Sequence, residues 1–261
     1  MTNIETLYKI VSMCRLHYYI CTRIILLSLL ITILFSLNSC KNDSDSHNDK
    51  QAYTIGEVLV TDDFSKSLSY WISEGNEPEI IDGQLVIDAN TFSTIWLKPL
   101  LLGNVLIEFD VTIIANNGSE SNPGYFGCFA MASDPANQTN FLAGINNRTE
   151  NFSRYDNLNL YHIKFGCDEN TSIELIKYNE GKQAIQVNLN KSKHNLSLNN
   201  KYHIQMLFLA YTIETNLNEQ QLFSCKQEHL YTQGQFGFNL NSIKAAIDNF
   251  RVIHLRMPES S

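Results

Sequence analysis

The stretch VLIEFDVTI, residues 105–113, decides the fold class of this chain. Its odd-numbered positions are all apolar, whereas Glu108, Asp110 and Thr112 lie between them. A period of two places two such sets on opposite faces of a β-strand. We therefore predict a strand whose apolar face packs on a core and whose polar face points away from it.

Ten further runs with strand-like patterning lie on both sides of this one. They are Glu79–Asp88, Ser93–Lys98, Tyr125–Ala132, Leu160–Cys167, Thr171–Tyr178, Ala184–Leu189, Tyr202–Tyr211, Gln221–Cys225, Gly234–Leu240 and Ile247–Leu255. Turn residues such as Asp82-Gly83 and Asn179-Glu180-Gly181 interrupt or separate them. No stretch has the apolar spacing of a long amphipathic helix. Many short strands in about 200 residues predict a single all-β domain, a sandwich or jelly roll.

The N-terminal segment has the pattern of an export signal. Three basic residues precede the twelve-residue apolar run Ile24–Phe35, which is short for a bilayer span but suits a signal peptide. Leu37-Asn38-Ser39-Cys40 follows and resembles a bacterial lipobox, in which the cysteine is lipidated. We predict a lipoprotein signal peptide over residues 1–39 and a lipid anchor at Cys40. An uncleaved anchor and a cleaved soluble export signal are the alternatives.

A polar segment separates the predicted anchor from the sandwich. Residues 41–51, KNDSDSHNDKQ, contain no apolar side chain and are predicted to form, with Cys40, a solvated tether. The sandwich domain then spans residues 52–257. The first tether residues, KNDSD, resemble the signal that places lipoproteins of Bacteroides-type bacteria on the outer face of the outer membrane. We expect an outer-membrane protein, held by lipid at Cys40, that faces the cell surface or the periplasm.

Composition excludes some classes of function. The chain has 261 residues and a formal charge of −8, which becomes −10 when three basic residues and one acidic residue leave with residues 1–39. Such a chain lacks the basic surplus that neutralises phosphates, so we expect no nucleic-acid partner. Besides Cys40, the mature part keeps Cys128, Cys167 and Cys225, without C-x-x-C spacing. We expect buried thiols, with one disulfide as the alternative.

Nine short motifs follow one another along the predicted domain. They are Asp62-Asp63-Phe64, Trp71, Asp82-Gly83-Gln84-Leu85, Ile95-Trp96-Leu97-Lys98, Met131-Ala132-Ser133-Asp134-Pro135, Tyr155–His162, Gly166–Ser172, Gly234–Phe238 and Asp248–Val252. In this order they resemble an uncharacterised concanavalin A-like family of Bacteroides-type lipoproteins, labelled as a domain of unknown function, over residues 56–255. The resemblance implies a concanavalin A-like jelly roll, a role in polysaccharide use, and a polysaccharide or oligosaccharide ligand.

Two stretches depart from the family pattern. Family members are rich in Arg and Thr after the turn that corresponds to Gly166–Ser172, and they carry Arg after Phe-Gly-Phe. Here the same places read Ile173–Tyr178 and Asn239-Leu240. If the family's arginines clamp an acidic sugar, that function is weakened or replaced in this chain.

Candidate ligand-binding residues gather where the family motifs are densest. They are Arg148, Tyr155, His162, Lys164, Lys177 and Tyr178. Alternation along Leu160–Cys167 places His162 and Lys164 on one face of that strand. Cations can attract uronate groups, and aromatic side chains can stack on sugar rings. The alternative is the ordinary polar face of an exposed strand. Trp71 and Trp96 are expected in the core rather than in a sugar platform.

Catalysis on the same scaffold stays open, with no catalytic residue assigned. Glu108 and Asp110 match two carboxylates of the Glu-x-Asp-x-x-Glu pattern of concanavalin A-like hydrolases, but the third position is Ile113. A polysaccharide lyase needs a group that neutralises a uronate carboxylate and a base such as Tyr, His or Lys. The candidates for these roles are Tyr161, His162, Lys164, Lys177 and Tyr178. We predict polysaccharide binding. An active lyase or hydrolase, or a structural or adhesion module without catalysis, are the alternatives.

A structural calcium ion is the one cofactor that the sequence raises. Some concanavalin A-like sandwiches bind one Ca²⁺ through oxygen ligands, and Asp63 and Asp248 would be the positions here. Solvated surface carboxylates are the alternative. No histidines show H-x-H or H-E-x-x-H spacing, so no transition-metal site is expected.

Overall fold

The computed structural model describes residues 53–114, 124–137, 140–147, 155, 157–167, 172–180, 182–189 and 196–258. The predicted signal peptide, Cys40, the tether and Arg148 lie outside these residues. Within them, no helix is both long and apolar enough to cross a bilayer.

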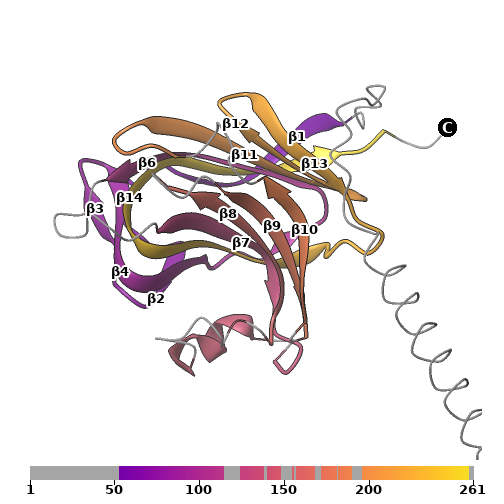
Figure 1. Cartoon of the computed structure of the whole chain (residues 1–261), viewed down its shortest axis with the longest axis horizontal. Coiled ribbons are helices and arrows are strands. Elements are labelled where there is room, and N and C mark those ends of the chain that lie inside the picture. Colours follow the sequence, from indigo (N-terminus) through magenta and orange to yellow (C-terminus); the bar gives the residue numbers. More distant parts are fainter. Residues whose placement is uncertain are drawn as a thin grey trace, which may run out of the picture. The chain divides into compact units, whose positions relative to one another are not determined.

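The described residues form fourteen strands and one short 3-10 helix, η1 (Figure 1). The strands are β1 Thr54–Asp62, β2 Trp71–Glu74, β3 Glu79–Ile81, β4 Gln84–Leu97, β5 Leu101–Leu102, β6 Val105–Ile114, β7 Tyr125–Ser133, β8 Asn159–Gly166, β9 Ile173–Asn179, β10 Lys182–Leu189, β11 Lys201–Leu209, β12 Thr212–Leu217, β13 Gln220–Lys226 and β14 Gln233–Arg256, and η1 is Phe141–Asn147. The predicted all-β sandwich is confirmed.

The strands hydrogen-bond in the order β10-β9-β8-β7-β14-β6-β11-β12-β13, and this sheet folds into two packed layers (Figure 1). Strand β14 belongs to both layers. Its first half pairs with β7 and its second half pairs with β6 and β1, while β4 pairs with it on both sides of the bend. The register shifts at Ser242, which has a positive φ of 52°. A bulge of this kind bends a strand without ending its ladder.

Layer A consists of β2, the second half of β4, the first half of β14, and β7 to β10. The second half of β14 lies in the other layer, with β1, β3, the first half of β4, β6 and β11 to β13. The main core fills the space between the layers and is rich in aromatic rings. Trp71 lies in it, stacked 5.3 Å from Phe238 and edge-on to Phe250 at 4.9 Å between ring centroids. Its indole Nε1 donates a hydrogen bond to Asp62 Oδ2 at 2.9 Å.

The strand quoted first behaves as its pattern predicts. The five odd-numbered side chains of residues 105–113 are at most 1% exposed and belong to the main core. Two predicted boundaries are wrong, because Ser93–Lys98 continues the strand that begins at Gln84, and Gly234–Leu240 and Ile247–Leu255 are one strand. In the second case the bulge at Ser242 carries the chain from one layer to the other without a loop.

We expect Phe109→Ala to lower the free energy of unfolding by roughly 3–5 kcal/mol, because it empties a fully buried aromatic site. Asp110→Ala on the opposite face should cost much less, since its partners Lys201 and His203 remain in contact with water. Urea unfolding of both variants measures the difference. Equal losses would contradict the assignment of the two faces.

Candidate functional site

The outer face of layer A, turned away from the main core, carries the candidate site. In β8, Tyr161, Ile163 and Phe165 point into the main core. The alternate side chains, among them His162 and Lys164, therefore point outward, as predicted. The same alternation in β7 sends Phe126 and Cys128 inward and leaves Gly127 on the outer face.

Cross-strand pairing aligns polar side chains in one line across this face. Going from β10 to β2, the positions that pair with one another are Asn188, Glu174, Lys164, Gly127, Asn239, Thr94 and Glu74. We call this line the polar row. Its members come from seven different strands and are brought together only by the register of the sheet. The row offers amide, hydroxyl, ammonium and carboxylate groups, which are the groups that bind sugar hydroxyls.

Hydrogen bonds hold the middle of the polar row in place. Asn239 Nδ2 donates to Thr94 Oγ1 at 2.9 Å, and the hydroxyl of Tyr125 donates to Asn239 Oδ1 at 3.0 Å. The hydroxyls of Thr94 and Tyr155 lie 3.0 Å apart and share a further hydrogen bond. Burial raises the pKa of Tyr125, so its phenol stays protonated and keeps donating. Asn239 and Thr94 are fully buried, so these amide and hydroxyl groups have fixed orientations beside the more exposed Lys164 and Glu174.

Lys164 and Glu174 form the charged part of the polar row. Lys164 Nζ lies 2.9 Å from Glu174 Oε2 and 4.8 Å from the centroid of the Tyr125 ring. The two charged side chains are 25% and 17% exposed, so a ligand can reach them. Phe92, half-buried, lies 6.5 Å from Tyr125 between ring centroids. The charged pair thus borders an aromatic pair of which Tyr125 is buried and Phe92 is half-buried.

The neighbouring line of side chains is apolar and is covered by η1. Trp96, Phe129, Leu160 and Ile176 form a second core there with Phe141 and Ile145 of η1, followed by Tyr155 and Leu158. Figure 1 shows η1 outside the two strand layers, and its Phe141 ring lies edge-on to Trp96 at 4.8 Å between ring centroids. Gly237 permits this packing, because a Cβ there would lie 2.7 Å from the Trp96 ring. Because η1 covers only the apolar line, Lys164 and Glu174 of the polar row remain in contact with water.

His162 lies at the boundary between the polar row and the second core. Its ring is fully buried, 4.5 Å from Phe129 and 5.6 Å from Tyr125 between centroids. Gly127 makes room for it, since a Cβ at Gly127 would lie 2.8 Å from His162 Nε2. Burial lowers the pKa of His162 well below its usual value, and the Lys164 charge acts in the same direction, while Asn239 acts against both. The imidazole is therefore neutral near pH 7.

The structure brings together four of the six predicted ligand residues. Tyr155, His162, Lys164 and Tyr178 all lie on the outer face of layer A, but Tyr155 and Tyr178 are nearly fully buried. Their rings are therefore packed rather than presented for stacking. Arg148 lies outside the described residues.

Lys177 lies on the opposite face of β9, which differs from the expected single surface. It pairs across strands with Tyr161 of the main core, and its Nζ donates to the backbone oxygen of His229 at 2.6 Å. The same ammonium lies 4.8 Å from the centroid of the Tyr231 ring. Successive residues of a strand point to opposite faces, so Lys177 and Tyr178 cannot share one surface.

Neither proposed calcium ligand has the surroundings of a metal site. Asp63 accepts hydrogen bonds from the backbone N and the hydroxyl of Ser65, and Asp248 lies 4.0 Å from Lys201 Nζ. No group of three or more His, Cys, Asp or Glu side chains within the described ranges could hold a metal ion. A bound calcium ion here would need further ligands besides these two carboxylates.

The carboxylates Glu108 and Asp110 lie on the outer face of the other layer. Glu108 pairs with Arg251, and Asp110 pairs with Lys201 and His203. The position that would complete the hydrolase pattern, Ile113, is buried in the main core. These carboxylates therefore belong to a surface ion-pair network, and the incomplete pattern has no third carboxylate.

Sequence reasoning missed Thr94, Tyr125, Glu174 and Asn239. The alternation Phe236-Gly237-Phe238-Asn239 already places Asn239 outward on its strand. Nothing local marks Thr94 as its partner, because the two residues are 145 positions apart and meet only through the β4–β14 register.

A protein-family model described as a domain of unknown function, DUF6250, matches residues 87–250. The chain belongs to this family. The match includes β6 to β13, η1 and most of β4 and β14, and with them every member of the polar row except Glu74. No curated protein matches the chain.

Solved structures share the fold at low sequence identity. A protein of unknown function with a galectin-like fold from Bacillus subtilis is 16% identical, with a TM-score of 0.62 over 79% of this chain and 100% of that one. The carbohydrate-binding module CBM66 from Bacillus subtilis is 15% identical, with a TM-score of 0.52 over 71% and 96%. An endo-β-1,3-glucanase from Pyrococcus furiosus is 11% identical, with a TM-score of 0.54 over 80% and 97%. These likenesses establish the fold.

The burial of His162 predicts a dependence of stability on pH. The folded state keeps this imidazole neutral, whereas the unfolded chain takes up a proton below its usual pKa of about 6.5. Stability is therefore lost as pH falls below about 6.5, at up to roughly 1.4 kcal/mol per pH unit from this one group. Urea unfolding at several pH values should show a shallower loss for His162→Gln than for the parent. Identical pH dependence in the two proteins would contradict the buried, neutral imidazole.

Proposed function

We propose that this protein is a lipid-anchored, carbohydrate-binding member of the DUF6250 family, with the polar row as its sugar-binding site. The observation that carries the proposal is the Lys164–Glu174 pair, which solvent reaches and which lies next to a buried, hydrogen-bonded set of donors and acceptors at Asn239, Thr94 and Tyr125. Oriented polar groups beside aromatic rings are what a sugar with several hydroxyls requires.

The relatives of the fold support a saccharide as the class of ligand. A carbohydrate-binding module and an endo-β-1,3-glucanase both share it with this chain. Fold likeness alone does not assign function, so the proposal depends on the site itself. There, Lys164 is the one cation among the described members of the row, and it is already paired with Glu174. We infer a ligand with hydroxyl groups and few charges, rather than one clamped by several arginines.

Catalysis by the same face is the second candidate, and His162 is the observation that favours it. A neutral imidazole beside an ammonium and the phenol of Tyr125 has the components of a base that removes a proton next to a neutralised carboxylate. Because His162 is fully buried, η1 and the second core would have to move before a sugar could reach the ring. Formation of unsaturated products from uronate-containing polysaccharides would establish lyase activity.

Binding should depend on Lys164 and not on Lys177. These two lysines lie on neighbouring strands but on opposite faces of layer A. For a polysaccharide found by thermal shift in a panel, Lys164→Gln should weaken affinity by about tenfold, the loss that follows when a charge-assisted hydrogen bond of about 1.4 kcal/mol is removed. Lys177→Gln is the matched control and should bind like the parent.

Isothermal titration of the three proteins measures these affinities. A loss of affinity in Lys177→Gln together with parental affinity in Lys164→Gln would place the ligand on another surface.

Membrane attachment should depend on Cys40. Because the proposed lipobox ends at this residue, Cys40→Ala should abolish acyl labelling and release the protein from the membrane fraction. Radiolabelled palmitate incorporation and fractionation of cells that produce each form measure both effects. Labelling and membrane association that survive the substitution would contradict lipidation at this cysteine.

A further inference from the structure

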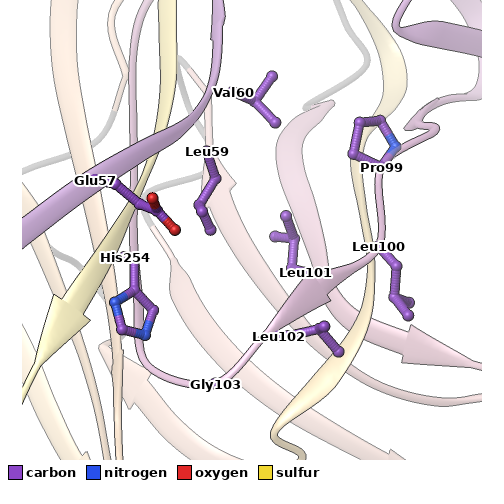
Figure 2. A pocket seen from close by; sticks show the side chains of 9 residues that line it. All are labelled: Glu57, Leu59, Val60, Pro99, Leu100, Leu101, Leu102, Gly103 and His254. Atoms are coloured by element: carbon purple, nitrogen blue, oxygen red, sulfur yellow. The ribbon is translucent and has the colours of Figure 1, made fainter.

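An apolar pocket opens where β1 approaches β5, away from the polar row. Its volume is about 550 Å³, and Leu59, Val60, Pro99 and the three leucines Leu100 to Leu102 line most of it. Figure 2 shows Leu59 and Leu101 in the middle, with Glu57 and His254 on one side and Pro99 and Leu100 on the other. Leu59, Leu100 and Leu102 are 40%, 53% and 54% exposed. We call these three residues the leucine patch.

The leucine patch is unusual for a strand surface. Leu101 points into the main core, so the alternation of a strand turns Leu100 and Leu102 outward. Outward positions on a half-buried strand are ordinarily polar, whereas here both are leucines. Clustered exposed apolar side chains of this kind mark a surface that another molecule or a membrane covers.

The position of the patch along the chain points to a membrane. Strand β1 begins at Thr54, and Cys40 and the apolar run Ile24–Phe35 precede it. The fourteen residues from Cys40 to Thr54 span at most about 50 Å when extended. Attachment through either Cys40 or the apolar run would therefore keep the leucine patch near the bilayer. Contact between the patch and the lipid then occurs at the high effective concentration that a tether provides.

The charges around the pocket favour apolar insertion over electrostatic attraction to lipid headgroups. The pocket has Glu57 and His254 but no Lys or Arg among its lining residues. The mature chain is also acidic, so it is not drawn to anionic headgroups. Apolar insertion is then the source of affinity, and it should be insensitive to salt.

We propose that the leucine patch inserts into the interface of the bilayer that anchors the protein, so that the β1–β5 edge rests on the membrane. This inference rests on the membrane attachment proposed above and not on sugar binding. It fixes which edge of the domain faces the lipid.

A tryptophan reporter tests the contact. The full chain, purified with its native membrane attachment, carries Leu102→Trp and is reconstituted in phosphatidylcholine vesicles with and without brominated lipid. Leu100→Trp serves as a second reporter. Tyr211→Trp is the matched control, because Tyr211 is 66% exposed and lies between β11 and β12, outside the patch.

We expect the emission of both patch reporters to shift to shorter wavelength on reconstitution and to be quenched by brominated lipid, at low and high salt alike. The control should show neither effect. Flotation of the vesicles reports attachment separately, so a failed anchor and a failed contact are distinguishable. Unquenched patch reporters on floating protein would overturn the proposal, as would a blue shift that depends on protein concentration alone and so reports contact with a second copy. Protein that does not float would overturn the contact together with the attachment.

Discussion

The continuous ladder of β14 is the constraint on which the rest of the structure depends. This strand of 24 residues pairs with β1, β4, β5, β6 and β7, and its bulge at Ser242 lets one chain segment serve both layers (Figure 1). Its inward side chains, among them Phe236, Phe238 and Phe250, hold the main core together. Because each pairing fixes a register, β14 also sets which side chains meet on the outer faces. Core and candidate site are consequences of the same ladder.

The outer face of layer A shows how one sheet can be both core and site. One line of side chains is apolar and lies under η1, and the adjacent line is polar and reaches solvent at Lys164 and Glu174. Gly127 and Gly237 mark the boundary, because each leaves space for a neighbouring ring, His162 in one case and Trp96 in the other. The polar groups next to this dry layer have fixed partners. Because these side chains are already ordered, less conformational entropy is lost when a ligand binds.

The sequence predicted the fold better than the site, for a physical reason. Fold class follows from a period of two, which is local, and residues 105–113 display it without reference to the rest of the chain. Faces within one strand were predicted for the same reason, as His162 and Lys164 confirm. The polar row depends on registers between strands up to 145 residues apart, which no local pattern encodes. The prediction that grouped Lys177 with Tyr178 joined residues by proximity in sequence, although neighbours in a strand point apart.

The central claim is that a saccharide binds the outer face of layer A through the polar row. Hydrogen–deuterium exchange with and without a bound oligosaccharide tests it most directly, because it reports the protection of backbone amides in every strand. The account predicts slower exchange in β7, β8, β9 and the first half of β14, with β6, β11 and β12 unchanged. Protection confined to β6, β11 and β12, around Glu108 and Asp110, would contradict it and would place the ligand on the opposite layer.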